Sequence, residues 1–124
     1  MKSLKSICLI TQDVQSLRDF YQNVLEVIPE GDDSFVVFSA SGANLSLFSA
    51  QNLEEMVPGR INDSGAGNCF LEFEVEDVDQ EYERLRGFNA EIVKPPTTQP
   101  WGLRSVWFHD PDGNKINFFA SVSQ

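Results

Sequence analysis

A chain of 124 residues with 41% hydrophobic residues is long enough for one globular domain, and its composition is neither that of a disordered chain nor that of a membrane protein. Nine Lys and Arg against nineteen Asp and Glu give a formal net charge of −10, which argues against nucleic acid as a partner. The acidic balance favours solubility and the approach of cationic ligands. No apolar run is long enough to cross a membrane, and the N-terminus leads straight into a strand, so we expect a cytoplasmic protein.

The first half of the chain predicts a strand, a helix and three more strands. An apolar run predicts the first strand at residues 7–10. Asp13 then suits an N-cap, where a carboxylate accepts hydrogen bonds from free backbone N–H groups. The helix that follows has one apolar face, made of Val14, Leu17, Phe20, Tyr21, Val24 and Leu25. Three strands are expected after it: a weakly patterned one at 27–29, then 35–39 and 44–49, with a turn at Ser41-Gly42.

The next segment, residues 51–67, is mostly polar and has no strand alternation. Pro58-Gly59 is a turn signal, and Gly65 and Gly67 add backbone freedom. We predict a mobile linker here, with one turn of helix at residues 53–56.

The second half repeats the pattern of the first. A strand at 70–73 leads to Asp77, a second N-cap, and to a helix that Gly87 ends. Gln80 is placed to complete a capping box with Asp77. Strands are predicted at 90–93, 103–108 and 115–120, the last two joined by a turn at residues 110–113. Because the Asp-Val pairs at 13 and 77 are 64 residues apart, we predict a duplicated strand–helix–three-strand unit.

These motifs together resemble the vicinal oxygen chelate, or glyoxalase/bleomycin-resistance/dioxygenase, family. The resemblance rests on the strand and helix around Asp13-Val14 and on the closing stretch at residues 99–114, whose Pro100-Trp101-Gly102 is most similar to metal-free bleomycin-resistance members. It implies an α+β fold in a single domain, residues 1–124. Two tandem βαβββ modules, about 1–50 and 68–124, would form curved mixed sheets around a cavity, with residues 51–67 as the linker. Many members pair, so we expect a homodimer.

The resemblance also locates the positions at which metal-dependent members carry His, Gln or Glu. Here they fall on Ser6, Ser46, Phe70 and Asn117. Divalent transition metals prefer imidazole, carboxylate or thiolate donors, and phenylalanine offers no donor at all. We therefore expect neither a bound metal nor a cofactor. The one histidine, His109, lies at a strand end away from these positions, and we expect it to pack at the surface or in the turn.

Strand alternation extends this set, because residues two apart face the same side of a sheet. The resulting candidate ligand-binding residues are Ser6, Cys8, Ser46, Phe48, Phe70, Glu72, Trp101, Asn117 and Phe119. Glu72 either pairs with a cationic ligand or points to solvent or a dimer contact together with Glu74. Trp101 either covers a flat ligand or anchors packing, and the side that Trp107 faces is left open. Cys8 and Cys69 are expected to be reduced and mostly buried.

The function predicted from the sequence is metal-independent binding of a small organic molecule, cationic or aromatic, as in antibiotic-resistance members of the family. The alternative is a glyoxalase- or dioxygenase-like lyase or oxidoreductase, which would need a metal as Lewis acid. A metal-free reaction with Glu72 or Cys8 as base has little support, and no catalytic residue is assigned. A third hypothesis is a regulatory or dimerisation module that binds no ligand.

Overall fold

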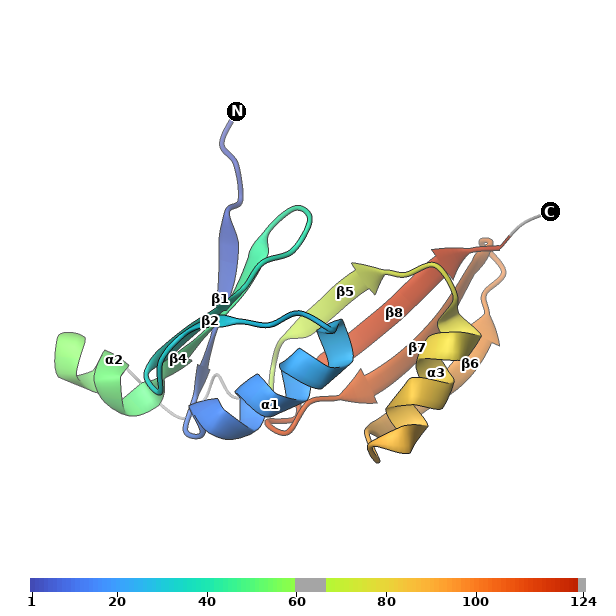
Figure 1. The fold of residues 1–124 in the computed structure, drawn as a ribbon. Coiled ribbons are helices and arrows are strands. Elements are labelled where there is room, and N and C mark those ends of the chain that lie inside the picture. The colour runs from blue at the N-terminus through green and yellow to red at the C-terminus, as the bar shows by residue number, and fades with distance from the viewer. Residues whose placement is uncertain (60–66, 123–124) are drawn as a thin grey trace. The chain divides into compact units, whose positions relative to one another are not determined.

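The computed structural model describes residues 1–59 and 67–122, and the chain divides into two compact units, residues 1–66 and 67–124 (Figure 1). Each unit contains a four-stranded mixed sheet with a helix following its first strand. The fold is therefore α+β, with the two βαβββ modules that the repeat predicted. The linker residue Gly65 lies outside the described residues.

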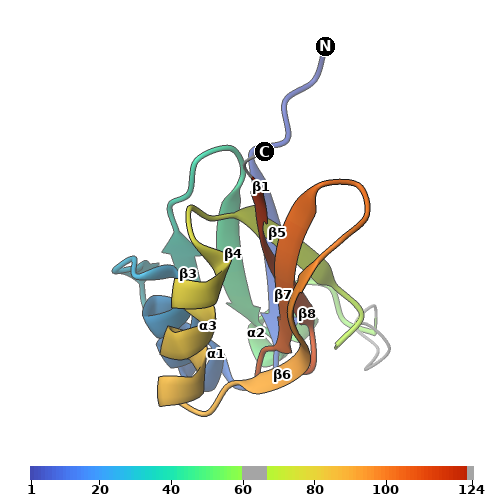
Figure 2. The same cartoon turned by 90° about the vertical axis from the view of Figure 1, so that its right-hand side faces the viewer.

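The first unit follows the predicted order closely. Its elements are β1 (Ser6–Thr11), α1 (Val14–Leu25), β2 (Glu30–Gly31), β3 (Phe35–Phe38), β4 (Asn44–Ser49) and α2 (Ala50–Met56). The sheet order is β1-β4-β3-β2, with β1 parallel to β4 (Figure 2) and the other pairs antiparallel. The Asp13 carboxylate accepts a hydrogen bond from the Ser16 backbone N–H at 3.0 Å, which confirms the N-cap.

Two predictions in this unit were wrong in their bounds. The strand expected at 27–29 forms instead at Glu30–Gly31, because Pro29 has no N–H to donate to a ladder. Gly31, at φ 130°, approaches β3 so closely that a Cβ would lie 2.1 Å from the Phe35 carbonyl oxygen. The single turn expected at 53–56 is a longer helix, α2, because the Ser49 side chain accepts from the Asn52 N–H and starts it earlier.

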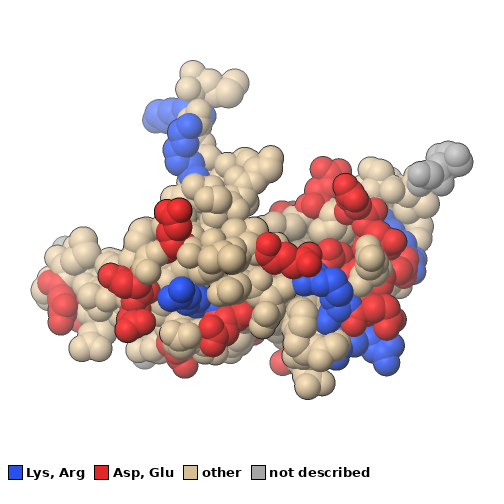
Figure 3. All heavy atoms as spheres, viewed as in Figure 1, with Lys and Arg blue, Asp and Glu red and all other residues tan. Residues whose placement is uncertain are grey.

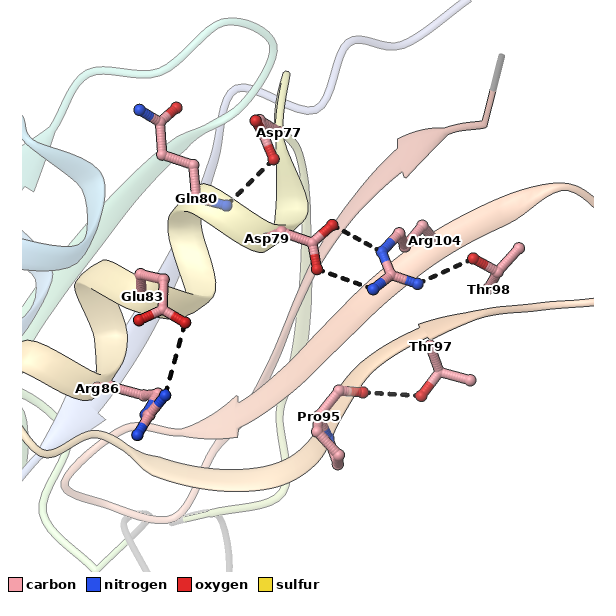
Figure 4. A network of polar contacts seen from close by, with 9 residues as sticks. All are labelled: Asp77, Asp79, Gln80, Glu83, Arg86, Pro95, Thr97, Thr98 and Arg104. Atoms are coloured by element: carbon pink, nitrogen blue, oxygen red, sulfur yellow. Dashed lines mark hydrogen bonds and ion pairs between the residues drawn. The ribbon is translucent and has the colours of Figure 1, made fainter. Parts of the chain in front are cut away.

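The second unit repeats this architecture. It contains β5 (Phe70–Glu74), α3 (Val78–Gly87), β6 (Glu91–Thr98), β7 (Leu103–His109) and β8 (Lys115–Ser121), in the sheet order β5-β8-β7-β6. The Asp77 carboxylate caps α3 by accepting from the Gln80 N–H at 3.1 Å. The Gln80 side chain points away from Asp77 (Figure 4), so the reciprocal half of the predicted capping box does not form.

The strand β6 is twice as long as the segment predicted at 90–93. Pro95 and Pro96 made a strand end there plausible, since proline cannot donate to a ladder. However, β6 is an edge strand of its sheet, and its pairing with β7 shifts register between Ile92 and Lys94 and again between Lys94 and Thr97. These irregularities accommodate the prolines without ending the strand.

One face of each sheet packs against the helix of its own unit. In the first unit α1 packs on β3 and β4, and in the second α3 packs on β6, β7 and β8. The core residues on these packing faces include Leu9, Leu45, Leu47, Leu71, Ile116 and Phe118. Tyr21 is fully buried as expected, whereas Ile7, although on the packing side of β1, is 37% exposed because β1 is an edge strand.

The surface carries the acidic balance of the sequence. Figure 3 shows Asp and Glu side chains spread over the viewed face of the molecule, with fewer Lys and Arg among them. Among the described residues, no helix is long and apolar enough to cross a membrane.

Candidate functional site

The face of the second sheet that is turned away from α3, called here the open face, carries a row of four polar and aromatic side chains. Strand register places Glu72 of β5 opposite Asn117 of β8, Asn117 opposite Trp107 of β7, and Trp107 opposite Lys94 of β6. Because paired residues project to the same side of a sheet, these side chains share one face. This cross-strand row brings two predicted site residues, Glu72 and Asn117, into contact.

The contact between Glu72 and Asn117 fixes the orientation of a buried amide. Asn117 Nδ2 donates to Glu72 Oε2 at 3.0 Å, and Asn117 is only 7% exposed. An ionised carboxylate accepts hydrogen bonds and cannot donate them, so it holds the NH₂ group of Asn117 toward itself. The amide oxygen, Asn117 Oδ1, is left buried without a hydrogen-bond partner among the described residues. A buried polar atom without a partner costs about 1–3 kcal/mol, so this oxygen favours a donor from outside.

Two aromatic rings lie beside this pair. The rings of Phe70 and Trp107 meet edge to face, with centroids 5.1 Å apart. Because β8 lies between β5 and β7, the rings meet above β8 and contribute to the burial of Asn117. The indole N–H of Trp107 is buried and, like the Asn117 oxygen, has no partner in the described part of the chain.

Lys94 completes the row at the far edge of the sheet. Its ammonium lies over the Trp107 ring, 5.7 Å from the centroid. A cation over an indole face is attracted by the ring quadrupole. The open face therefore presents a carboxylate, an amide, an indole and an ammonium on four adjacent strands.

The remaining predicted site residues of this unit lie toward one end of the sheet. Phe119 is paired with Glu74 and Ser105, and it is half-buried on the open face. Trp101 lies in the connection between β6 and β7 and is 71% exposed, so it does not anchor packing within this unit. At the opposite end, His109 Nδ1 lies 2.8 Å from Glu91 Oε1, a surface contact as expected for this histidine.

The predicted site residues of the first unit share the equivalent face of their own sheet. Cys8 is paired with Ser46, and Phe48 contacts Phe35 edge to face with centroids 5.8 Å apart. Ser6 lies one pleat before Cys8 on the same side. The sequence places Ser6 and Phe70 at the repeat-equivalent starts of β1 and β5, and the register agrees with that alignment.

Cys8 corrects the expectation of two mostly buried thiols. It is exposed because β1 is an edge strand, whereas Cys69 is half-buried. Partial burial nevertheless raises the pKa of the Cys8 thiol above its ordinary value. Burial, and then the negative charge of Asp110, raise the pKa of Cys69. Since the thiolate is the reactive form, neither environment activates a cysteine as a base or nucleophile.

The four positions that correspond to the family's metal ligands do not fit a divalent transition metal. Ser6, Ser46 and Asn117 offer neutral oxygens, and Phe70 offers an aromatic ring. The one carboxylate in contact with them, that of Glu72, accepts from Asn117. In the described ranges, 1–59 and 67–122, no cluster of three or more His, Cys, Asp or Glu could hold a metal.

Sequence reasoning missed two members of the row. The facing of Trp107 was obtainable, because the turn at residues 110–113 sets the β7–β8 register and thereby pairs Trp107 with Asn117. Lys94 had no such signal, since it lies between the two irregularities in the pairing of β6 with β7.

Comparisons with known proteins agree with this architecture. The chain is 30% identical over 129 residues to the uncharacterised protein YraH of Bacillus subtilis, covering 96% of this chain and 98% of that protein. It is 24% identical to the fosfomycin resistance protein FosX of Listeria innocua, covering 98% and 92%. A solved glyoxalase/bleomycin resistance protein/dioxygenase from Nocardioides superposes with a TM-score of 0.81 at 27% identity, over 99% of this chain and 85% of that one.

The family profile described as Glyoxalase/Bleomycin resistance protein/Dioxygenase superfamily matches residues 3–118. That span includes the whole cross-strand row and every helix and strand up to the middle of β8. This chain belongs to the glyoxalase/bleomycin resistance protein/dioxygenase superfamily.

Proposed function

We propose that this protein binds a small organic molecule, cationic or aromatic, without a metal, and that it does so at the open face of the second sheet. The observation that carries the proposal is the Glu72–Asn117 hydrogen bond at a family metal-ligand position, beside the Phe70 and Trp107 rings. A carboxylate next to aromatic faces attracts a cation both by charge and by the ring quadrupoles. Largely apolar sites with a few placed polar groups are typical of small-molecule binding.

Sequestration of an antibiotic-like compound is the biological role that we propose for such binding. One relative is named a fosfomycin resistance protein, and Pro100-Trp101-Gly102 resembles the bleomycin-resistance type. Trp101, exposed in the connection between β6 and β7, is available to cover a flat ligand. The proposal includes a homodimer and a cytoplasmic location.

The enzymatic alternative has less support. A glyoxalase- or dioxygenase-like reaction needs a Lewis acid, and the donor set at the four aligned positions does not fit one. A metal-free reaction needs a base, and the raised pKa of Cys8 disfavours its thiolate. Among the described residues Glu72 accepts a hydrogen bond from Asn117, whose amide is neither an acid nor a base.

Thermal-shift and calorimetric titration with cationic aromatics, from phenethylamine to ethidium, tests the proposal, with 2-phenylethanol as the neutral match. A binder specific for the native state raises the melting temperature. Glu72→Gln removes the charge but keeps the shape, so we expect it to weaken binding of the amines about tenfold, the loss of one charge-assisted hydrogen bond.

Glu76→Gln is the control for Glu72→Gln, since it removes the same charge from an exposed residue outside the row. Equal affinity of Glu72→Gln and the unmodified protein for the amines would contradict the role of Glu72. Stoichiometric zinc, nickel, iron or manganese bound at the aligned positions in the purified protein would contradict the metal-independent function itself.

A further inference from the structure

The open face carries opposite charges at the two ends of the cross-strand row. Glu72 lies on one edge strand, β5, and Lys94 lies on the other, β6, with Asn117 and Trp107 between them. Within the described residues neither Glu72 nor Lys94 forms an ion pair. Both charges are therefore available to a ligand.

The middle of the row offers one acceptor and one donor. Asn117 Oδ1 and Trp107 Nε1 are both buried, and neither has a hydrogen-bond partner in the described part of the chain. They belong to residues that are directly paired across β8 and β7. A secondary amide, with one N–H and one C=O, complements such a pair by donating to Asn117 and accepting from Trp107.

The charged groups of Glu72 and Lys94 lie closer together than the backbones of the two strands that carry them. Neighbouring strands are about 4.8 Å apart, so the backbones of Glu72 and Lys94 are separated by roughly 14 Å. Glu72 reaches inward to Asn117, and the Lys94 ammonium reaches inward over Trp107. The charges are thus separated by roughly one to two strand spacings, on the order of 5–10 Å. Two extended residues of a peptide span at most about 7 Å, which is within this range.

Building on the proposed function, we infer that the ligand is a zwitterion with an amide between its charges, as in an aromatic dipeptide. Its ammonium pairs with Glu72, its carboxylate pairs with Lys94, and its amide joins Asn117 Oδ1 and Trp107 Nε1. Its aromatic group packs with Phe70 and Trp107. Access to the two buried atoms requires the Phe70 ring to rotate, and its 45% exposure leaves it room.

Glycyl-phenylalanine and its capped derivatives are the probes that test this inference. Glycyl-phenylalaninamide retains only the cation, and acetyl-glycyl-phenylalanine retains only the anion. We expect the zwitterion to bind about tenfold more tightly than either capped form, because each cap removes one charge-assisted contact. Calorimetry measures all three affinities. Quenching in Trp101→Phe, which leaves Trp107 as the remaining tryptophan, reports whether the probe reaches the row.

Two charge variants assign the contacts. Lys94→Met should abolish the advantage of the zwitterion over the amide-capped probe, so that this variant binds the two probes with equal affinity. Glu72→Gln should abolish the higher affinity of the zwitterion relative to the acetylated probe. Lys5→Met and Glu76→Gln make the same charge changes outside the row, and both advantages should persist in them. Lys94→Gln provides a second removal of the charge if Lys94→Met proves unstable.

The outcomes separate this inference from the function on which it rests. Equal affinity for glycyl-phenylalanine and its amide would contradict the inference that the ligand is a zwitterion. So would a higher affinity for glycyl-phenylalanine than for its amide that persists in Lys94→Met. If cationic aromatics then still bind with dependence on Glu72, the proposed function stands. If neither the amines nor the dipeptides bind at millimolar concentration, both ideas fail.

Discussion

The two modules share a frame but differ in what they display on it. The row across the first sheet that is equivalent to the cross-strand row is made of Cys8, Ser46, Val37 and Glu30. The row across the second sheet is made of Glu72, Asn117, Trp107 and Lys94. One row thus holds a thiol, a hydroxyl, an isopropyl group and a carboxylate, where the other holds a carboxylate, an amide, an indole and an ammonium.

The side chains buried between sheet and helix are alike in the two modules. On the helix side both modules bury aliphatic and aromatic residues, such as Leu47 and Phe38 in the first and Ile116 and Phe108 in the second. The buried positions on the helix side maintain the fold, so they tolerate only apolar residues of suitable shape. The open side is free to diverge. The edge strands diverge too, since β2 has two residues and β6 has eight.

Leu85→Ala is the variant that we expect to destabilise the protein most, because it removes a buried side chain from the helix side of the second sheet. Leu85 is fully buried on α3, and its truncation should lower the free energy of unfolding by about 2–5 kcal/mol through lost burial and a cavity. Urea denaturation followed by circular dichroism measures it. Lys94→Met, on the open face of the same sheet, should change stability by no more than about 0.5 kcal/mol. Similar losses in the two variants would mean that the open face also maintains the fold.

The turns that lead into β4 and β8 give a second comparison. Asp110 is 5% exposed, and its carboxylate accepts from the backbone N–H groups of Asp112 and Asn114 and from Asn114 Nδ2. Asn114 Oδ1 in turn accepts from the Cys69 N–H at the start of β5. The turn of the first module has one such contact, from the Ala40 N–H to Asn44 Oδ1.

Asp110→Ala should therefore destabilise the protein by about 2–3 kcal/mol, because it leaves several buried donors without an acceptor. Ser41→Ala, in the exposed turn of the first module, should change little. Thermal and urea unfolding of the two variants provide the measurement. A near-neutral Asp110→Ala would show that other groups, or water, satisfy these donors.

The fold was largely predictable because local signals and the repeat agreed. Asp13 and Asp77 cap the helices as predicted, and the apolar face of α1 gave its buried residues. The errors in the bounds of strands fall where prolines and edge strands override local patterning, at β2 after Pro29 and at β6 around Pro95. Proline is a barrier to strand pairing only when its N–H is needed, and the sequence does not show which edge a strand occupies.

Only the part of the candidate site on β5 and β8 was predicted from the sequence. Asn117 came from the family resemblance and Glu72 from strand alternation with Phe70, and a hydrogen bond brings the two together. The partnerless indole of Trp107 and the position of Lys94 depend on three-dimensional register and on the Phe70–Trp107 ring contact, which no local pattern encodes.

The smallest expected effect concerns an ion pair that only the second module has. Arg104 of β7 donates to both carboxylate oxygens of Asp79 in the first turn of α3, at 2.8 and 2.9 Å, and to Thr98 Oγ1 at 3.0 Å (Figure 4). The repeat-equivalent positions of the first module hold Gln15 and Ser34. The hydrogen bonds from Arg104 hold the pKa of Asp79 below its usual range, and the Asp79 side chain is largely exposed.

Because the pKa of Asp79 is lower in the folded state than in the unfolded chain, its contribution to stability is present above the ordinary Asp pKa of about 3.9. The contribution is lost as the pH falls through the folded-state value. Asp79→Asn should therefore lower the melting temperature slightly at pH 7, and the difference from the unmodified protein should shrink toward pH 3. In an Arg104→Met background the pH-dependent part of the difference should vanish. If the pH-dependent difference persists in the Arg104→Met background, the helix terminus rather than Arg104 lowers the pKa of Asp79. The Asp79–Arg104 pair would then add nothing to the stability of the second module.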